Sequence, residues 1–337
     1  MKLDVNGFQT SYRVTISRGL INRLGPYFSE ETTYVLLTDD GIPQSYVEKV
    51  KQVLNPKKTF IIKQGEASKC MNTYEEILLS MQKVNLQRSG HLVALGGGVV
   101  SDIGGFVAAT YKRGIPFTII PTTLLSMVDA SIGGKVAINT QHAKNSIGTF
   151  YTPEQVLIDP DTLNTLSKRQ LNSGLSEVIK SALIGDETLF DDLKHPYQTL
   201  DIEMIIYKAL SVKKVFVESD FMDQGKRQIL NYGHTIGHAV ERESDFSLLH
   251  GECVAIGMKL MAKDKPYYKA LLDVLKRHDL DLSIPRSIDI DALLLHIKED
   301  KKVYNDILHI IDVEKVGNGF IKTIKEEDIK QILQGDV

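Results

Sequence analysis

The chain has 337 residues, of which 42% are hydrophobic and 25% charged, a composition typical of a soluble globular protein with about two domains. The formal net charge is −3, and lysine and arginine are scattered along the chain, so we expect no general nucleic-acid binding. The only two cysteines, Cys70 and Cys253, lie far apart in the sequence, which argues against a disulfide framework or a cysteine zinc site. No signal-peptide core and no run of about 18 apolar residues occurs. We therefore expect a cytoplasmic protein without a membrane segment.

Short β-rich runs alternate with helical patterns in the first half of the chain. The runs that predict strands are 10–17, 33–40, 59–65, 91–100 and 116–125. The patterns that predict amphipathic helices are 45–54 and 74–86. Strands that alternate with helices are typical of a parallel sheet of the α/β class.

The character of the sequence changes at 164–167. From Lys168 onward the apolar residues recur with a helical period, and Ser167 is suited to cap the first of these helices. A short β-like run at 306–324 predicts a hairpin around Gly317 and Gly319. We therefore predict an α/β domain over 1–166 and a mainly helical domain over 167–337.

A histidine-rich stretch gives the first indication of chemistry. His234, His238 and His250 fall within about twenty residues, and the first two are four residues apart, on one face of a predicted helix. Glu177 is the nearest upstream carboxylate within an apolar helical pattern. Two histidines and a glutamate with an open position suit a catalytic divalent metal, most often zinc. Spacing alone favours His234 and His238 as the pair of ligands, although such pairs are more often packed or exposed side chains without chemistry.

Three glycines at 96–98 follow a predicted buried strand and precede a helical pattern. They would let the backbone approach a pyrophosphate at a helix N-terminus, and Asp39, at the end of an earlier strand, could bond a ribose hydroxyl. Because the pattern is not GxGxxG, a simple tight turn explains it equally well. Lys180 lies three residues after Glu177 on the same helix face, where a lysine would favour an anionic substrate.

Taken together, several motifs resemble the 3-dehydroquinate synthases. They occupy residues 94–139, 144–163, 174–180, 213–227, 230–241 and 250–258, and the similarity is collinear from about residue 60 to 260. The resemblance implies a Rossmann-like N-terminal domain, a helical C-terminal domain and an active site in the cleft between them. It also implies NAD+ and one divalent metal ion, zinc or else cobalt, as cofactors.

The resemblance assigns the metal ligands as Glu177, His234 and His250, and makes His238 a pocket residue that handles protons near the substrate phosphate. The positions that match NAD contacts are Asp39, Glu66, Lys69, Gly97, Gly98, Val99, Asp102, Thr122, Thr123, Leu125, Lys144, Thr165 and Leu166. The positions that match catalytic and substrate contacts are Arg113, Asp129, Lys135, Asn145, Lys180, Lys213, Arg227, Asn231 and His238, together with Lys301 or Lys302. In the family Arg113 reaches across a dimer interface, so a homodimer is implied.

The implied reaction is a phosphate lyase reaction that also closes a ring. 3-Deoxy-D-arabino-heptulosonate 7-phosphate is transiently oxidised, loses phosphate, is reduced again, opens and closes by an intramolecular aldol step to 3-dehydroquinate. A polyol dehydrogenase on the same framework, a cyclase acting on a different sugar phosphate and a nucleotide-binding module without catalysis are the alternatives. The chain departs from the family pattern at Ser101, where glycine is usual, at Phe221, where glutamate is usual, and after Lys302, where a glycine is missing.

Overall fold

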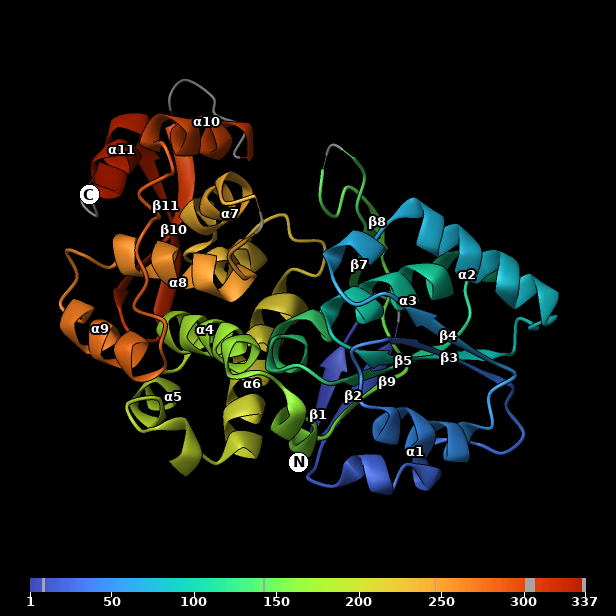
Figure 1. Ribbon diagram of the computed structural model, residues 1–337. Helices are drawn as coiled ribbons and strands as arrows, with labels where there is room; N and C mark the ends of the chain where they lie inside the picture. Colours follow the sequence, from blue (N-terminus) through green and yellow to red (C-terminus); the bar gives the residue numbers. More distant parts are fainter. Residues whose placement is uncertain (8–9, 142, 246, 301–306, 335–337) are drawn as a thin grey trace. The chain divides into compact units, whose positions relative to one another are not determined.

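The computed structural model describes residues 1–7, 10–141, 143–245, 247–300 and 307–334. The chain divides into two compact units, Met1–Leu166 and Ser167–Val337 (Figure 1). Within the described residues, no helix combines the length and the apolar character needed to cross a membrane.

The first unit is built on a seven-stranded sheet with the strand order β1-β2-β9-β6-β5-β3-β4. Its strands are β1 (Lys2–Asn6), β2 (Ser11–Ile16), β3 (Tyr34–Asp39), β4 (Lys58–Ile62), β5 (His91–Gly96), β6 (Phe117–Pro121) and β9 (Gln155–Ile158). The strands from β2 to β4 in this order pair in parallel, as expected. The edge strand β1 is antiparallel to β2, because the few residues between them cannot make the long crossover that parallel pairing needs.

Helices cover both faces of this sheet. Figure 1 shows α2 (Met71–Lys83) and α3 (Gly98–Thr110) on one side and α1 (Gln44–Leu54) on the other. A smaller antiparallel pair, β7 (Lys135–Ile138) with β8 (Ile147–Phe150), completes the unit. The strand expected at 91–100 ends at Gly96, because Val99 and Val100 lie in the first turn of α3 instead. A short apolar run of this kind fits a strand or a buried helix equally well.

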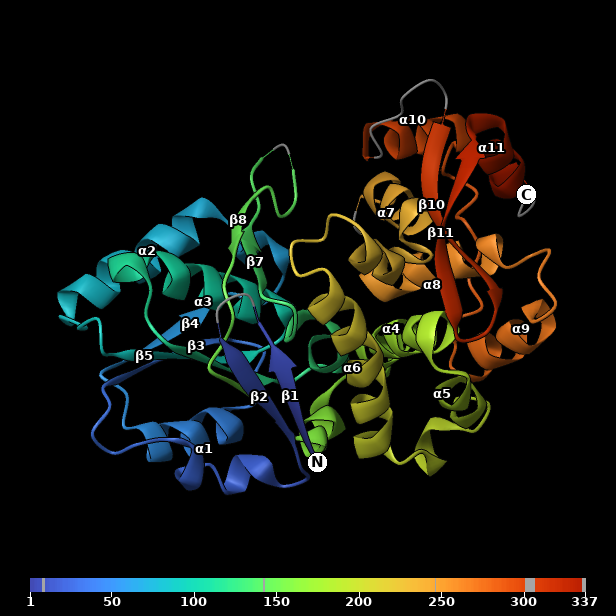
Figure 2. The same ribbon diagram turned by 180° about the vertical axis from the view of Figure 1, so that it is seen from behind.

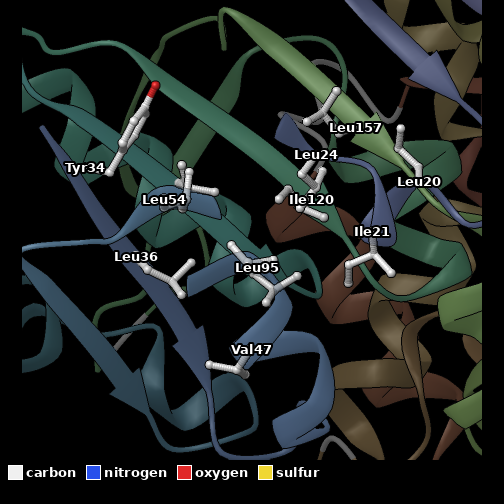
Figure 3. Close-up of a cluster of buried hydrophobic side chains, with 12 residues drawn as sticks. Leu20, Ile21, Leu24, Tyr34, Leu36, Val47, Leu54, Leu95, Ile120 and Leu157 are labelled. Carbon is white, nitrogen blue, oxygen red and sulfur yellow. The ribbon is translucent and has the colours of Figure 1, made fainter. Parts of the chain in front are cut away.

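The face under α1 holds a closely packed apolar cluster (Figure 3). Val47, Val50 and Leu54 of α1 recur at helical spacing and are buried against Leu36 of β3 and Leu95 of β5. Each fully buried side chain of this size stabilises the fold by roughly 1.5–3 kcal/mol. This packing holds the central strands, and therefore the loops at their ends, in fixed positions.

In its described residues the second unit is mainly helical and contains one hairpin. Its helices are α4 (Lys168–Gly185), α5 (Glu187–Asp192), α6 (Ile202–Ser219), α7 (His234–Glu243), α8 (His250–Met261), α9 (Tyr268–Arg277), α10 (Ile290–Asp300) and α11 (Glu326–Gln334). Ser167 caps α4, since its hydroxyl accepts a hydrogen bond from the Gln170 backbone N–H. Figure 2 shows the expected hairpin, formed by β10 (Ile307–Lys315) and β11 (Asn318–Lys325). Its turn uses Gly317 at a φ of 85°, a conformation that favours glycine.

His91, the first residue of β5, makes the stability of the first unit sensitive to acid. Its Nε2 bonds the Thr118 hydroxyl at 2.9 Å, its Nδ1 lies 3.6 Å from Glu154, and burial lowers its pKa to about 4. Because the unfolded histidine titrates near 6.5, the unfolded state binds the proton more tightly. The contribution of neutral His91 to the free energy of unfolding is therefore fully present above pH 6.5 and is lost as the pH falls towards 4.

We expect the parent protein to lose about 2 kcal/mol more stability between pH 7 and pH 5 than His91→Gln loses. Urea unfolding of both proteins at the two pH values measures this difference. His195→Gln, which changes an exposed histidine, serves as the control and should behave as the parent. Equal losses in the parent and His91→Gln would contradict the prediction.

Candidate active site

Three side chains from three helices converge in the second unit. Glu177 lies on α4, His234 begins α7 and His250 begins α8, and their ligand atoms all lie within 4.8 Å of one another. The Glu177 Oε1 atom is 3.5 Å from Nε2 of His234 and 3.4 Å from Nε2 of His250. Oε1 is buried and has no hydrogen-bond partner among the described residues. A buried carboxylate oxygen without a partner is costly. A divalent cation bound by these three groups would remove this cost, so the residues fit a metal ion.

Two glycines bring the three helices into contact. A Cβ atom at Gly251 would lie 2.0 Å from the carbonyl oxygen of Ser173, one turn before Glu177 on α4. A Cβ atom at Gly257 would lie 2.0 Å from the carbonyl oxygen of Gly233, the residue before His234. Only glycine permits backbones to approach this closely. The start of α8 therefore packs directly on α4, and its later turn packs on the start of α7.

The charges around this group are arranged to keep Glu177 ionised. Burial disfavours its charge, but Lys180, which donates to Oε2, and the two imidazoles outweigh it and hold the pKa of Glu177 well below its usual range. Burial and then Lys180 lower the pKa of His234. For His250, the carboxylates of Glu177 and Glu241 outweigh burial and raise the pKa to about 10. Because imidazole binds metals in its neutral form, metal binding must displace a proton from His250.

His238 lies beside this group but outside it. Its ring centroid is 5.2 Å from that of His234 and 5.9 Å from that of His250. Helical spacing alone favours His238 as the second histidine ligand, yet the three ligand atoms that converge include that of His250 instead. The His238 side chain is exposed and therefore accessible to solvent.

Buried cations provide further positive charge in this unit. Lys180, Lys213 and Arg227 are only 2%, 7% and 4% exposed, which is rare for such residues. The Asp220 carboxylate accepts backbone N–H bonds from Gly225 and Arg227 and thereby shapes the loop that carries the arginine. The departure at Phe221 is compatible with this role, since Arg227 Nη1 donates to the Phe221 backbone carbonyl oxygen at 2.6 Å.

In the first unit, the residues that match NAD contacts gather at the carboxyl edge of the sheet. Asp39 ends β3, the glycines at 96–98 end β5 and begin α3, and Thr122 follows β6. From β3 the chain moves outward to β4, whereas from β5 it moves in the opposite direction to β6. Nucleotides bind parallel sheets at such a switch point. Thr122 Oγ1 is buried there without a hydrogen-bond partner among the described residues, so the edge has an unused polar group to offer a ligand.

The remaining positions are more open. Of the other predicted positions in the first unit, Glu66, Arg113, Lys135, Lys144, Asn145 and Thr165 are exposed, and Val99, Asp102, Thr123, Leu125, Asp129 and Leu166 are partly buried. Asp129 lies in a five-residue π-helix, Ser126–Ala130, a feature frequent at functional sites. In the second unit Asn231 is partly buried. Lys301 and Lys302 lie outside the described residues.

Comparison with known proteins now places the chain. The family model "3-dehydroquinate synthase N-terminal" matches residues 59–173, and the model "3-dehydroquinate synthase C-terminal" matches residues 174–303. The chain belongs to the 3-dehydroquinate synthase family. The family that the motifs predict, and the combination of a parallel-dominated sheet with a helical region, are thereby confirmed.

Relatives of this family match over the whole chain. The 3-dehydroquinate synthase of Streptococcus mutans serotype c is 39% identical over 99% of this chain and 100% of its own length. A crystal structure of 2-deoxy-scyllo-inosose synthase has a TM-score of 0.89 and 25% identity, and the match covers 100% of both chains. The 2-epi-5-epi-valiolone synthase from Streptomyces hygroscopicus subsp. jinggangensis, with NAD+ and Zn2+ bound, has a TM-score of 0.86 and 26% identity over 97% of both chains.

Asn139 is a functional candidate that sequence reasoning missed. Its Nδ2 donates to Glu66 Oε1 at 2.7 Å, and its Oδ1 accepts from the Asn145 backbone N–H at 2.8 Å. Lys69, in turn, donates to Asp102 and to Asn145 Oδ1. Asn139 therefore connects two loops of this 3-dehydroquinate synthase family member that both carry NAD-matching positions. Its place at the end of the glycine–lysine motif, 133–139, is the only signal in the sequence.

We expect Asn139→Ala to weaken NAD+ binding about tenfold, because two hydrogen bonds of roughly 1 kcal/mol each no longer hold the loops and part of that free energy must then be supplied by NAD+ binding. Isothermal titration with NAD+ measures the change. Thr140→Ala, which removes hydrogen bonds to Ala143 and Ser146 in the second loop, is the matched control and should bind NAD+ within about twofold of the parent. An Asn139→Ala protein with parental affinity would rule out this role.

Proposed function

We propose that this chain is a carbon–oxygen lyase that converts 3-deoxy-D-arabino-heptulosonate 7-phosphate to 3-dehydroquinate and inorganic phosphate, a step of the shikimate pathway to the aromatic amino acids. The observation that carries the proposal is the converging group of Glu177, His234 and His250, with its partnerless carboxylate oxygen, in a member of this family.

The proposed cofactors are NAD+ and one divalent metal ion, zinc or else cobalt. When bound, NAD+ would supply the acceptor and donor of a hydride at C5 of the substrate, and the metal would favour ionisation of the substrate's hydroxyl groups. Glu177, His234 and His250 would hold the metal, and the carboxyl edge of the sheet would hold NAD+. The presence of NAD+ and Zn2+ in the 2-epi-5-epi-valiolone synthase supports both assignments.

The protein's own residues bind and orient a substrate that carries a phosphate and a carboxylate. We assign this binding to the cations Arg113, Lys135, Lys180, Lys213 and Arg227, since fixed cations are needed for two anionic groups. Asn145 and Asn231 would bond its hydroxyls, and Asp129 would orient a lysine or a water. A polyol dehydrogenase would not need three buried cations in the metal-binding unit, so the burial of Lys180, Lys213 and Arg227 favours the lyase.

Abstraction of the C6 proton of the substrate needs no strong base from the protein. Once C5 is a ketone, the proton on C6 is acidic. The phosphate group of the substrate can accept this proton before the phosphate itself leaves. His238, exposed beside the metal-ligand group, would handle a proton near that phosphate. Ring opening and intramolecular aldol closure complete the product.

A phosphate-release assay tests the proposal. With heptulosonate phosphate, NAD+ and zinc, we expect phosphate and 3-dehydroquinate in equal amounts, no net NADH, and loss of turnover on chelation that zinc or cobalt restores. Accumulation of NADH without phosphate would establish a dehydrogenase. Turnover of glucose 6-phosphate in place of heptulosonate phosphate would establish a different cyclase. An inert protein would leave only nucleotide binding.

We also infer a cytoplasmic homodimer. The support for it is the family resemblance and the exposed Arg113, which stands with Lys112 in a left-handed backbone conformation, φ 65° and 49°. Sedimentation of the purified protein with and without NAD+ would show a dimer.

A further inference from the structure

Both imidazoles of the metal-ligand group are held at the ring nitrogen that faces away from Glu177. His234 Nδ1 lies 3.1 Å from the backbone carbonyl oxygen of Tyr232. His250 Nδ1 lies 3.3 Å from Oε2 of Glu241. In each ring Nδ1–H donates to this acceptor, so Nε2 is the nitrogen left to bind an ion, in His250 once its second proton has been displaced. The two histidines therefore present the same nitrogen, but one is held by a neutral carbonyl and the other by a carboxylate.

Glu241 is built into the same helix face as His234. It follows His234 by seven residues on α7, two helical turns later, and its side chain is only 13% exposed. A carboxylate on the outer nitrogen of a ligating histidine fixes the ring orientation and strengthens the other nitrogen as a donor. We propose that Glu241 is a positioning residue of the metal centre, which orients His250 through Nδ1 so that Nε2 can bind the ion. This inference rests on the metal site of the proposed function.

His250 needs such a partner more than His234 does. The His234 side chain is 10% exposed, whereas the His250 side chain is 29% exposed. Packing therefore restrains the His250 ring less than the His234 ring. The orientation of the His250 ring depends more on its hydrogen bond to Glu241. The sequence offers no local sign of this contact, since Glu241 and His250 belong to different helices.

Glu243 supplies a matched control on the same helix. Its Oε1 lies 2.5 Å from Nε2 of His296 on α10, so it makes the same kind of carboxylate–imidazole pair with a histidine that is outside the metal-ligand group. Replacing Glu243 removes one carboxylate from α7 without touching the partner of His250. Any effect specific to Glu241 therefore reports on the metal centre rather than on helix charge.

The experiment compares Glu241→Ala, Glu241→Gln and Glu243→Gln in the full chain. Zinc affinity is measured by competition with a chromophoric chelator, and the ligand field by the visible spectrum of the Co2+ form, both without substrate. We expect Glu241→Ala to bind zinc 10–100-fold more weakly and to shift the Co2+ spectrum. Glu241→Gln, which keeps an acceptor oxygen but lacks the charge, should fall between Glu241→Ala and the parent, and Glu243→Gln should match the parent.

Zinc affinities of both Glu241 variants within twofold of Glu243→Gln, with unchanged Co2+ spectra, would overturn the inference. If Glu241→Ala fails to fold, the near-isosteric Glu241→Gln decides by the same criterion. Parent protein that binds zinc but releases no phosphate would defeat the proposed function and leave this inference standing. Parent protein that binds no zinc would overturn the inference together with the metal site.

Discussion

His250→Ala will lose zinc binding, whereas His238→Ala will keep it and lose turnover. The reason is positional. His250 Nε2 is 3.4 Å from Glu177 Oε1 and belongs to the three converging ligand atoms, while His238 stands outside that group. A site with only three protein ligands cannot lose one and retain its affinity. Removing His238 takes away the group that we propose handles a proton, an effect of roughly 10²–10⁴-fold on rate.

Metal analysis of the two purified variants after dialysis against zinc measures zinc binding. A phosphate-release assay measures turnover, which should be absent in His250→Ala and reduced in His238→Ala. His195→Ala, at an exposed position of the same unit, should retain both metal and activity. Equal metal loss in His238→Ala and His250→Ala would refute the ligand assignment.

The sequence predicts the secondary elements well where the signal is local. The helix at Gln44–Leu54 follows from apolar residues at helical spacing, and the hairpin at Gly317 follows from turn chemistry between two β-rich runs. The expected strand over 91–100 is too long because Val99 and Val100 suit a strand and a buried helix equally. The alternation of strands and helices predicts only parallel strands, which are joined through a helix. It therefore does not predict the edge strand β1, which is antiparallel to β2 and joined to it by only a few residues.

The candidate site was harder to predict from the residues alone. Helical spacing connects His234 only with residues of its own helix, so it favours His238. His250 approaches because Gly251 and Gly257 let α8 pack backbone to backbone on its neighbours. That contact is tertiary, and no periodicity encodes it. The links made by Asn139 and Glu241 were missed for the same reason. The family resemblance supplied the ligand set because it already contains such long-range information.

Lys180→Met will strongly destabilise the metal-free protein. The Lys180 and Glu177 side chains are 3% and 2% exposed, and the ammonium donates directly to the carboxylate. Removing one partner of a buried ion pair costs about 3–5 kcal/mol. Here the carboxylate loses the cation that donates to Oε2 and keeps only the imidazoles beside Oε1. For a unit of this size the melting temperature should fall on the order of 10 °C. Lys208→Met, which breaks a more exposed pair with Asp192, should cost under about 1 kcal/mol.

Zinc separates the structural from the catalytic contribution of Lys180. A bound dication supplies positive charge to the same carboxylate, so thermal unfolding of Lys180→Met with zinc should recover much of the stability that is lost in the presence of a chelator. Turnover should not recover if Lys180 binds the substrate anion as proposed, because the metal cannot replace that cation. A loss of about 10²-fold or more in turnover should then remain. A variant that is as stable as the parent under chelation would show that Glu177 accepts a proton at little cost. A variant whose turnover returns with zinc would remove Lys180 from the substrate site.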